Sequence, residues 1–147
     1  MTSNDETFIQ RSRAIAAIVS TAHKLYREVT HCAKTYKLTE SQYNALRILR
    51  GAERRGEQLT QADLADRLIA SRANTTWILD RLEERKLIAR KGHTDRRKNL
   101  VELTPTGVKL LAKIDPEFDA MMTRILGHVD TGDLHTLMGT LGSFKFE

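Results

Sequence analysis

The residues best suited to chemistry lie between positions 90 and 104, in the segment RKGHTDRRKNLVELT. Five cationic side chains fall within residues 90–98, and a single carboxylate, Asp95, lies among them; the cations are Arg90, Lys91, Arg96, Arg97 and Lys98. The residues that follow alternate between apolar and polar, as in a half-buried strand. A loop of this kind indicates either an anionic partner, such as nucleic-acid phosphate, or a solvated turn. The flanking elements must decide between the two.

The rest of the sequence carries no pattern typical of an enzyme. The histidines lack metal-ligand spacing such as HExxH, and there is no Gly-rich phosphate loop or nucleophile elbow. The neighbouring carboxylates Glu83 and Glu84 fit a solvated helix face. We therefore expect no catalytic residues, no metal and no cofactor.

Length and composition indicate one globular domain over residues 1–147. The chain is 40% hydrophobic and 29% charged, with 24 Lys and Arg against 19 Asp and Glu, a net charge of +5. No apolar run approaches the roughly 18 residues of a membrane helix. The opening MTSNDETF is unlike a secretory signal. A cytoplasmic location without membrane contact is therefore expected.

Apolar periodicity predicts a long first helix over residues 8–36. Its apolar residues recur at alternating spacings of three and four, a narrow seam typical of helices that pair. They are Ile15, Ile18, Ala22, Leu25, Val29, Cys32 and Tyr36. A second helix is predicted at about 40–53, because Thr39 and Gln42 form a capping-box pattern.

The middle of the chain predicts a helix-turn-helix followed by a hairpin. Thr60, with Asp63 three residues later, opens a short helix, and Ser71 opens another that runs to about residue 85. A turn of a few residues separates them, as in a helix-turn-helix. Strands are predicted at 87–90 and 99–103, with a loop at 92–98. The basic loop therefore lies directly after a helix-turn-helix.

Two further helices are predicted in the C-terminal third. Thr104 and Pro105 are typical of the N-cap and first residue of a helix. Pro116 lies within this helix and should kink or interrupt it. A last short helix is predicted at about 131–142.

The helix that begins at Ser71 has two faces of different chemistry. Thr75, Ile78, Leu79 and Leu82 cluster on one face, which must pack inward. The opposite face presents polar and aromatic residues in its first turns and acids only later, which suits entry into a DNA major groove by the N-terminal end. The predicted contact residues are Ser71, Arg72, Asn74, Thr76 and Trp77. For Ser71 and Asn74 helix capping is an alternative, and for Trp77 packing within the protein is an alternative.

Residues 59–107 resemble the MarR family of bacterial transcription regulators. The most specific element is an Asp-x-Arg pair followed by an alternating strand that ends in Leu-Thr and a later Gly. Here these residues are Asp95, Arg97, Leu103, Thr104 and Gly107. The resemblance implies a mainly α fold with a small β-hairpin wing, a winged helix-turn-helix at 39–104. It also implies terminal dimerisation helices at 1–38 and 105–147.

The resemblance also implies roles for the wing and for partners. Arg97 would reach the minor groove and Asp95 would brace the loop, while Arg90, Lys91, Arg96 and Lys98 would lie along phosphates. The protein would be a homodimer on a roughly palindromic double-stranded operator. It would be a repressor released by an unknown small effector, possibly aromatic or phenolic. His23 and Tyr26 could line the effector pocket, or be boundary residues of the first helix.

Two alternative functions remain open from the sequence. A winged helix can serve protein or RNA contacts, with the basic loop as an unspecific patch. A thiol-based redox sensor through Cys32 is the other alternative. The apolar seam around Cys32 favours a structural thiol instead.

Overall fold

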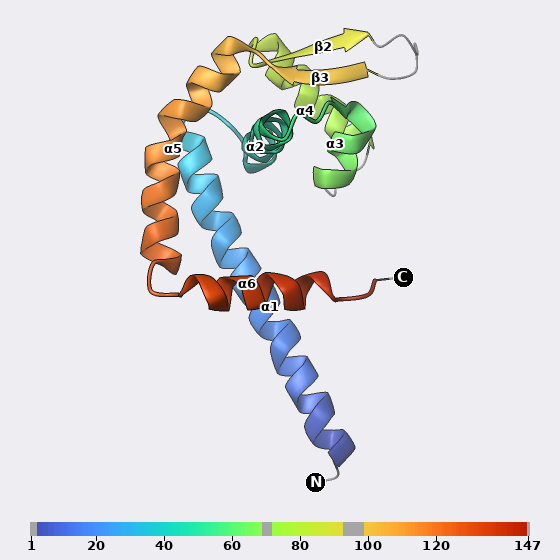
Figure 1. The fold of residues 1–147 in the computed structure, drawn as a ribbon, viewed down its shortest axis with the longest axis vertical. Coiled ribbons are helices and arrows are strands. Elements are labelled where there is room, and N and C mark those ends of the chain that lie inside the picture. Colours follow the sequence, from blue (N-terminus) through green and yellow to red (C-terminus); the bar gives the residue numbers. More distant parts are fainter. Residues whose placement is uncertain (1–2, 69–71, 93–98, 147) are drawn as a thin grey trace. The chain divides into compact units, whose positions relative to one another are not determined.

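The computed structural model describes residues 3–68, 72–92 and 99–146, which form six helices and three strands (Figure 1). The order along the chain is α1 (Ser3–Thr35), α2 (Glu40–Arg54), β1 (Leu59–Thr60), α3 (Gln61–Leu68), α4 (Arg72–Glu84), β2 (Ile88–Gly92), β3 (Asn99–Leu103), α5 (Pro105–Leu126) and α6 (Thr131–Gly142). The prediction of a mainly helical fold with a small β-hairpin is therefore confirmed.

The chain divides into two compact units, Met1–Ile114 and Asp115–Glu147. The boundary falls inside α5. The first unit contains α1 to α4 and the whole sheet, so every described residue of the expected DNA-binding segment belongs to one compact body.

The core of the first unit is built around α2. Helix α2 contacts α3, α4 and β3, and it is seen along its axis between them in Figure 1. Tyr43 and Leu46 of α2 are fully buried, as are Leu64 of α3 and Leu79 and Leu82 of α4. Each such side chain contributes about 1.5–3 kcal/mol by leaving water. These contacts hold the helix-turn-helix to the rest of the body.

Local hydrogen bonds fix where the helices begin. The backbone N–H of Gln42 donates to Thr39 Oγ1 at 3.2 Å, and the backbone N–H of Thr39 donates to Gln42 Oε1 at 3.0 Å. Thr60 and Asp63 repeat this reciprocal pattern at the start of α3, with distances of 2.8 and 3.2 Å. Both predicted N-caps are therefore confirmed.

The sheet has three antiparallel strands in the order β1-β3-β2. In the hairpin Ile88 pairs with Leu103 and Arg90 pairs with Val101. The two-residue strand β1, which pairs Leu59 with Val101, was not predicted, because so short a strand has no detectable periodicity. Strand β3 is thus central, and β2 lies at an edge of the sheet.

The turn between α4 and β2 is tight. Lys86 has φ of 57°, and Leu87 N–H donates to Leu82 O at 3.0 Å, the pattern of a Schellman motif. The left-handed residue reverses the chain, so that β2 starts four residues after α4 ends. The hairpin is therefore attached directly to the helix-turn-helix, as predicted.

Helix α5 begins as predicted but is not interrupted. The N–H of Gly107 donates to Thr104 Oγ1 at 3.1 Å, which confirms Thr104 as the N-cap. Pro116 removes one N–H from the helical ladder, yet α5 continues to Leu126. The predicted interruption is therefore wrong, whereas a kink at Pro116 stays a prediction. Buried side chains on both sides of Pro116, Ile114 and Phe118, favour the helical conformation.

The apolar seam of α1 is buried only at its C-terminal end. Cys32 is 3% exposed, whereas Ile15 is 62% exposed and Leu25 is 36% exposed. In helix α6 the apolar residues Leu137, Met138 and Leu141 are also exposed. Within the described ranges, no helix combines the length and the apolar character that a membrane crossing requires.

Candidate nucleic-acid interface

Helix α4 turns one face into the core of the first unit. Thr75, Ile78, Leu79 and Leu82 are all buried, at the spacing expected for one side of a helix. This confirms the predicted inward face. The opposite side of α4 is therefore the surface on which a ligand could be bound.

The outward face of α4 is exposed in its first two turns. Ala73, Asn74 and Trp77 are exposed, and Thr76 is half-buried. Trp77 has 51% of its surface exposed, which favours a contact surface over packing within the protein. Ser71 and the side chain of Arg72, two other predicted contact residues, lie outside what the structure describes.

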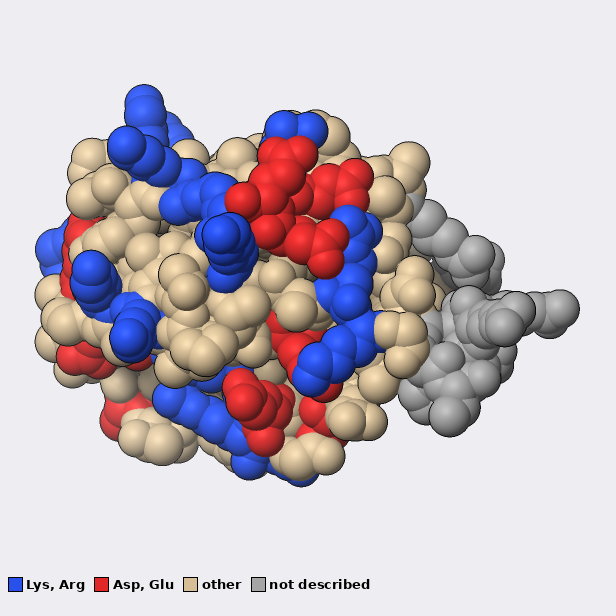
Figure 2. All heavy atoms as spheres, turned by 90° about the horizontal axis from the view of Figure 1, so that it is seen from above, with Lys and Arg blue, Asp and Glu red and all other residues tan. Residues whose placement is uncertain are grey.

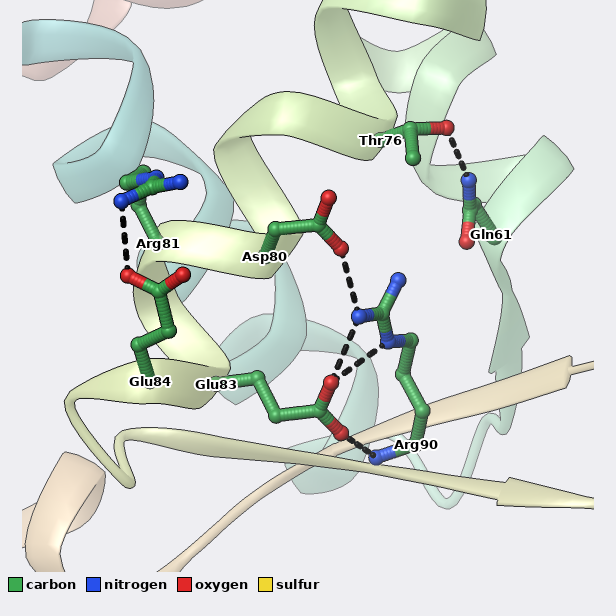
Figure 3. Close-up of polar contacts among 7 residues, drawn as sticks. All are labelled: Gln61, Thr76, Asp80, Arg81, Glu83, Glu84 and Arg90. Atoms are coloured by element: carbon green, nitrogen blue, oxygen red, sulfur yellow. Dashed lines mark hydrogen bonds and ion pairs between the residues drawn. The ribbon is translucent and has the colours of Figure 1, made fainter.

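Gln61 belongs to this surface, although the sequence analysis did not find it. Its Nε2 donates to Thr76 Oγ1 at 2.7 Å (Figure 3). Gln61 is the first residue of α3, so this bond joins the two helices of the helix-turn-helix next to the outward face. It restricts the orientation of the Thr76 hydroxyl. No sequence signal links the two residues, which lie fifteen positions apart.

Arg90 has a different setting from the one expected. Its guanidinium donates to Glu83 Oε2 from Nε at 2.9 Å, and to Asp80 Oδ1 from Nη2 at 2.6 Å (Figure 3). Instead of extending into solvent toward phosphates, Arg90 joins strand β2 to the outward side of α4. The expectation that Glu83 is simply solvated is wrong for the same reason.

The charges of this cluster stabilise one another. The side-chain hydrogen bond from Arg90 lowers the pKa of the Glu83 carboxyl below its usual range. The bonds to Glu83 and then to Asp80 raise the pKa of Arg90. Glu84 also has a partner, because Arg81 Nη1 lies 2.8 Å from its Oε2. The acids at the C-terminal end of α4 are therefore partly neutralised within the protein.

The remaining wing residues are only partly described. Lys91 Nζ lies 2.6 Å from Glu102 Oε2 across the hairpin, and both side chains are exposed to solvent. Asp95, Arg96, Arg97 and Lys98 lie outside the described residues, so their expected roles stay predictions.

Charge is not segregated on the face seen from above in Figure 2. Lys and Arg side chains alternate there with Asp and Glu over the described surface. A uniformly basic patch therefore does not cover the described part of this face.

The other predicted sites lie on α1. His23 and Tyr26 line a shallow hollow whose described lining residues all come from α1. The Cys32 thiol is buried, which favours its structural role over redox sensing. In the described part of the chain, no cluster of His, Cys, Asp and Glu could hold a metal ion.

The helix pair of α3 and α4, the hairpin of β2 and β3, and the exposed face of α4 together define a winged helix-turn-helix protein. Residues 38–99 match the sequence profile of the MarR family. This match confirms the resemblance to the MarR family that residues 59–107 show in the sequence.

Similar proteins include transcription regulators from several bacteria. The chain is 28% identical over 120 residues to the HTH-type transcriptional regulator MhqR of Bacillus subtilis (strain 168), covering 81% of this chain and 75% of that protein. A MarR family transcriptional regulator from Silicibacter pomeroyi DSS has a TM-score of 0.76 at 28% identity, covering 86% and 82% of the two chains. The structure of S. aureus MepR in complex with DNA has a TM-score of 0.72 at 22% identity, covering 86% and 89%.

Proposed function

We propose that this protein is a transcription regulator that binds a specific double-stranded DNA sequence through α4 and the wing. The observation that carries the proposal is the outward face of α4, whose first two turns expose Asn74 and Trp77 beside Thr76 and contain no acid. A major groove about 12 Å wide admits one helix, and amide and hydroxyl groups can bond to base edges there. Ser71 and Arg72 complete the proposed contact set.

The ion pairs at the other end of α4 support the same orientation. Asp80, Glu83 and Glu84 would repel phosphates if they were unpaired near DNA. Their pairing with Arg90 and Arg81 reduces this repulsion but leaves three carboxylates against two cations, so this end of α4 keeps a net charge of −1. The N-terminal half of α4 would therefore face the bases, while the C-terminal half lies away from them.

The wing would supply affinity more than base identity. Arg97 is proposed to enter a minor groove, whose narrow form attracts cations, and Asp95 would orient it by accepting a hydrogen bond. Lys91, Arg96 and Lys98 would lie along phosphates, which position a protein without reading sequence.

Exposed apolar residues support a homodimer. The seam of α1 and helix α6 both have apolar side chains that are exposed to water in the single chain, and a second copy could cover them. A two-fold symmetric dimer would address two half-sites about one helical turn apart, on a roughly palindromic operator.

Repression released by a small, possibly aromatic or phenolic, effector is a finer part of the proposal, with His23 and Tyr26 as effector contacts. It is supported by the family resemblance alone. A preferred duplex can be selected from random DNA and placed so that it overlaps a promoter. In vitro transcription from this promoter should fall when the protein is added, and should recover with the effector. Increased transcription would contradict the repressor assignment.

Substitutions should separate base reading from groove shape. Thr76→Ala is expected to cost roughly 1–3 kcal/mol of binding free energy on the preferred duplex and to relax discrimination between bases at one or two positions.

Arg97→Ala should weaken binding to many sequences together and make the slope of log affinity against log salt concentration shallower by about one unit. Competition binding on single-base variants of a duplex selected from random DNA, at two salt concentrations, measures both effects.

Arg97→Lys is the matched control, because it keeps the charge and should keep the salt dependence. Equal binding of the unsubstituted protein to all duplexes, or a preference for RNA or protein, would contradict the proposed function.

A further inference from the structure

We infer that Arg90 is a positioning residue that locks the wing onto the recognition helix, and that its charge does not bind phosphate. The inference rests on the proposed DNA-binding function. The structural observation is the contact of one arginine of β2 with two carboxylates that lie on successive turns of α4 (Figure 3).

Strand β2 is an edge strand, so on one side its backbone N–H groups have no neighbouring strand. The N–H of Arg90 points to this side and donates to Glu83 Oε1 at 3.2 Å. Glu83 therefore receives hydrogen bonds from both the backbone and the side chain of the same residue. This arrangement fixes the strand itself against α4, in addition to the arginine side chain.

The guanidinium already contacts two carboxylates through its Nε and Nη2. Its Nη2 lies 2.5 Å from Glu83 Oε2 and 2.6 Å from Asp80 Oδ1, and the side chain is only 24% exposed. One cation between two carboxylates leaves the cluster with a net charge of −1. A phosphate would therefore meet a cluster of net negative charge at Arg90, where two of the three guanidinium nitrogens already form charge-assisted hydrogen bonds.

The contacts of Arg90 with Asp80 and Glu83 lie where they can set the direction of the hairpin. The described part of β2 ends only two residues after Arg90, at Gly92, where the hairpin leads toward residues 93–98. Each strand residue extends the hairpin by about 3.3 Å. A small change in the direction of β2 at Arg90 would therefore displace the far end of the hairpin by a larger distance. Arg90 would thus fix the distance between the contacts of the wing and those of Thr76 in the neighbouring groove.

The salt dependence of DNA affinity distinguishes a positioning role of Arg90 from a phosphate contact. Arg90→Met and Arg90→Lys should each weaken binding to the selected duplex by about tenfold, with the salt slope changed by much less than one unit. Lysine keeps the charge but cannot form the forked contact with Asp80 and Glu83, so it should fail like methionine. Arg97→Met is the matched variant for which the slope should become shallower by about one unit.

Hydrogen exchange in the free protein gives a readout that does not depend on DNA. Arg90→Met and Glu83→Gln should both increase amide exchange in β2 and β3, while the exposed variant Lys91→Met should not. Unchanged thermal midpoints for the helical core would show that each variant is folded.

Two results would overturn the inference. One is a slope that becomes shallower by about one unit in Arg90→Met and is restored by Arg90→Lys, which would make Arg90 a phosphate contact while the proposed function stands. The other is unchanged amide exchange in both Arg90→Met and Glu83→Gln. If the unsubstituted protein shows no preference for any DNA sequence, the proposed function fails. The amide-exchange measurement would still show whether Arg90 holds β2 against α4.

Discussion

Replacing Ile15 and Ile18 by glutamate should convert the protein into monomers and lower its affinity for a two-half-site duplex by about 10²–10⁴-fold. Both residues belong to the apolar seam of α1, and both are exposed in the single chain. Charged groups there could not be buried against a second copy without a large desolvation cost. Each monomer would then bind one half-site without the effective concentration that a linked second site provides. Light scattering at micromolar concentration and binding to the same duplex measure the two effects.

Ser20→Glu with Arg27→Glu is the matched control. These positions lie on the side of α1 opposite the seam, and both are exposed. The control protein should remain dimeric, although its more negative charge should weaken DNA binding modestly and at low salt most strongly. A seam variant that is monomeric and still binds with unchanged affinity would exclude the proposed dimer as the DNA-binding form.

Gly107→Ala should destabilise the protein by about 3 kcal/mol, at the upper end of overpacking costs. A Cβ at Gly107 would collide with the backbone carbonyl oxygen of Leu87 and lie 3.1 Å from its carbonyl carbon. The N–H of Thr104 donates to the same Leu87 oxygen at 3.1 Å, and Thr104 Oγ1 donates to Lys86 O at 2.6 Å. The start of α5 therefore lies directly against the turn between α4 and β2, and neither backbone can move without losing these bonds.

Gly92→Ala, at the end of β2, is the control, because a Cβ there would meet nothing within 4 Å. Its midpoint of unfolding in urea should be nearly unchanged, whereas that of Gly107→Ala should fall. Equal stability of the two variants would mean that the contact between Gly107 and Leu87 is not rigid.

The sequence was sufficient for the elements whose signals are local. Capping side chains lie three residues from their partners, as with Thr39 and Gln42, so both the residue types and the spacing are visible. The inward face of α4 follows from helical periodicity alone. Pro116 shows the limit of local rules, because α5 continues past it to Leu126 although proline removes one N–H from the helix.

Contacts between elements were not predictable in the same way. Arg90 and Glu83 lie seven positions apart, but only the reversal at Lys86 brings β2 back along α4. The same holds for Gln61 and Thr76, which meet because α3 and α4 pack together. From the sequence alone, the carboxylate partners of Arg90 in the preceding helix were therefore not recognisable.

Trp77 allows the most direct test of the claim that the outward face of α4 enters DNA. It is the single tryptophan of the chain, so its fluorescence reports on this one position of the helix. In the free protein acrylamide should quench it readily, because its indole is half exposed. Saturation with the selected duplex should protect Trp77 strongly from quenching, while an equal concentration of an unrelated duplex at the same salt should protect it little. Tight, sequence-specific binding that leaves the quenching of Trp77 unchanged would contradict the account.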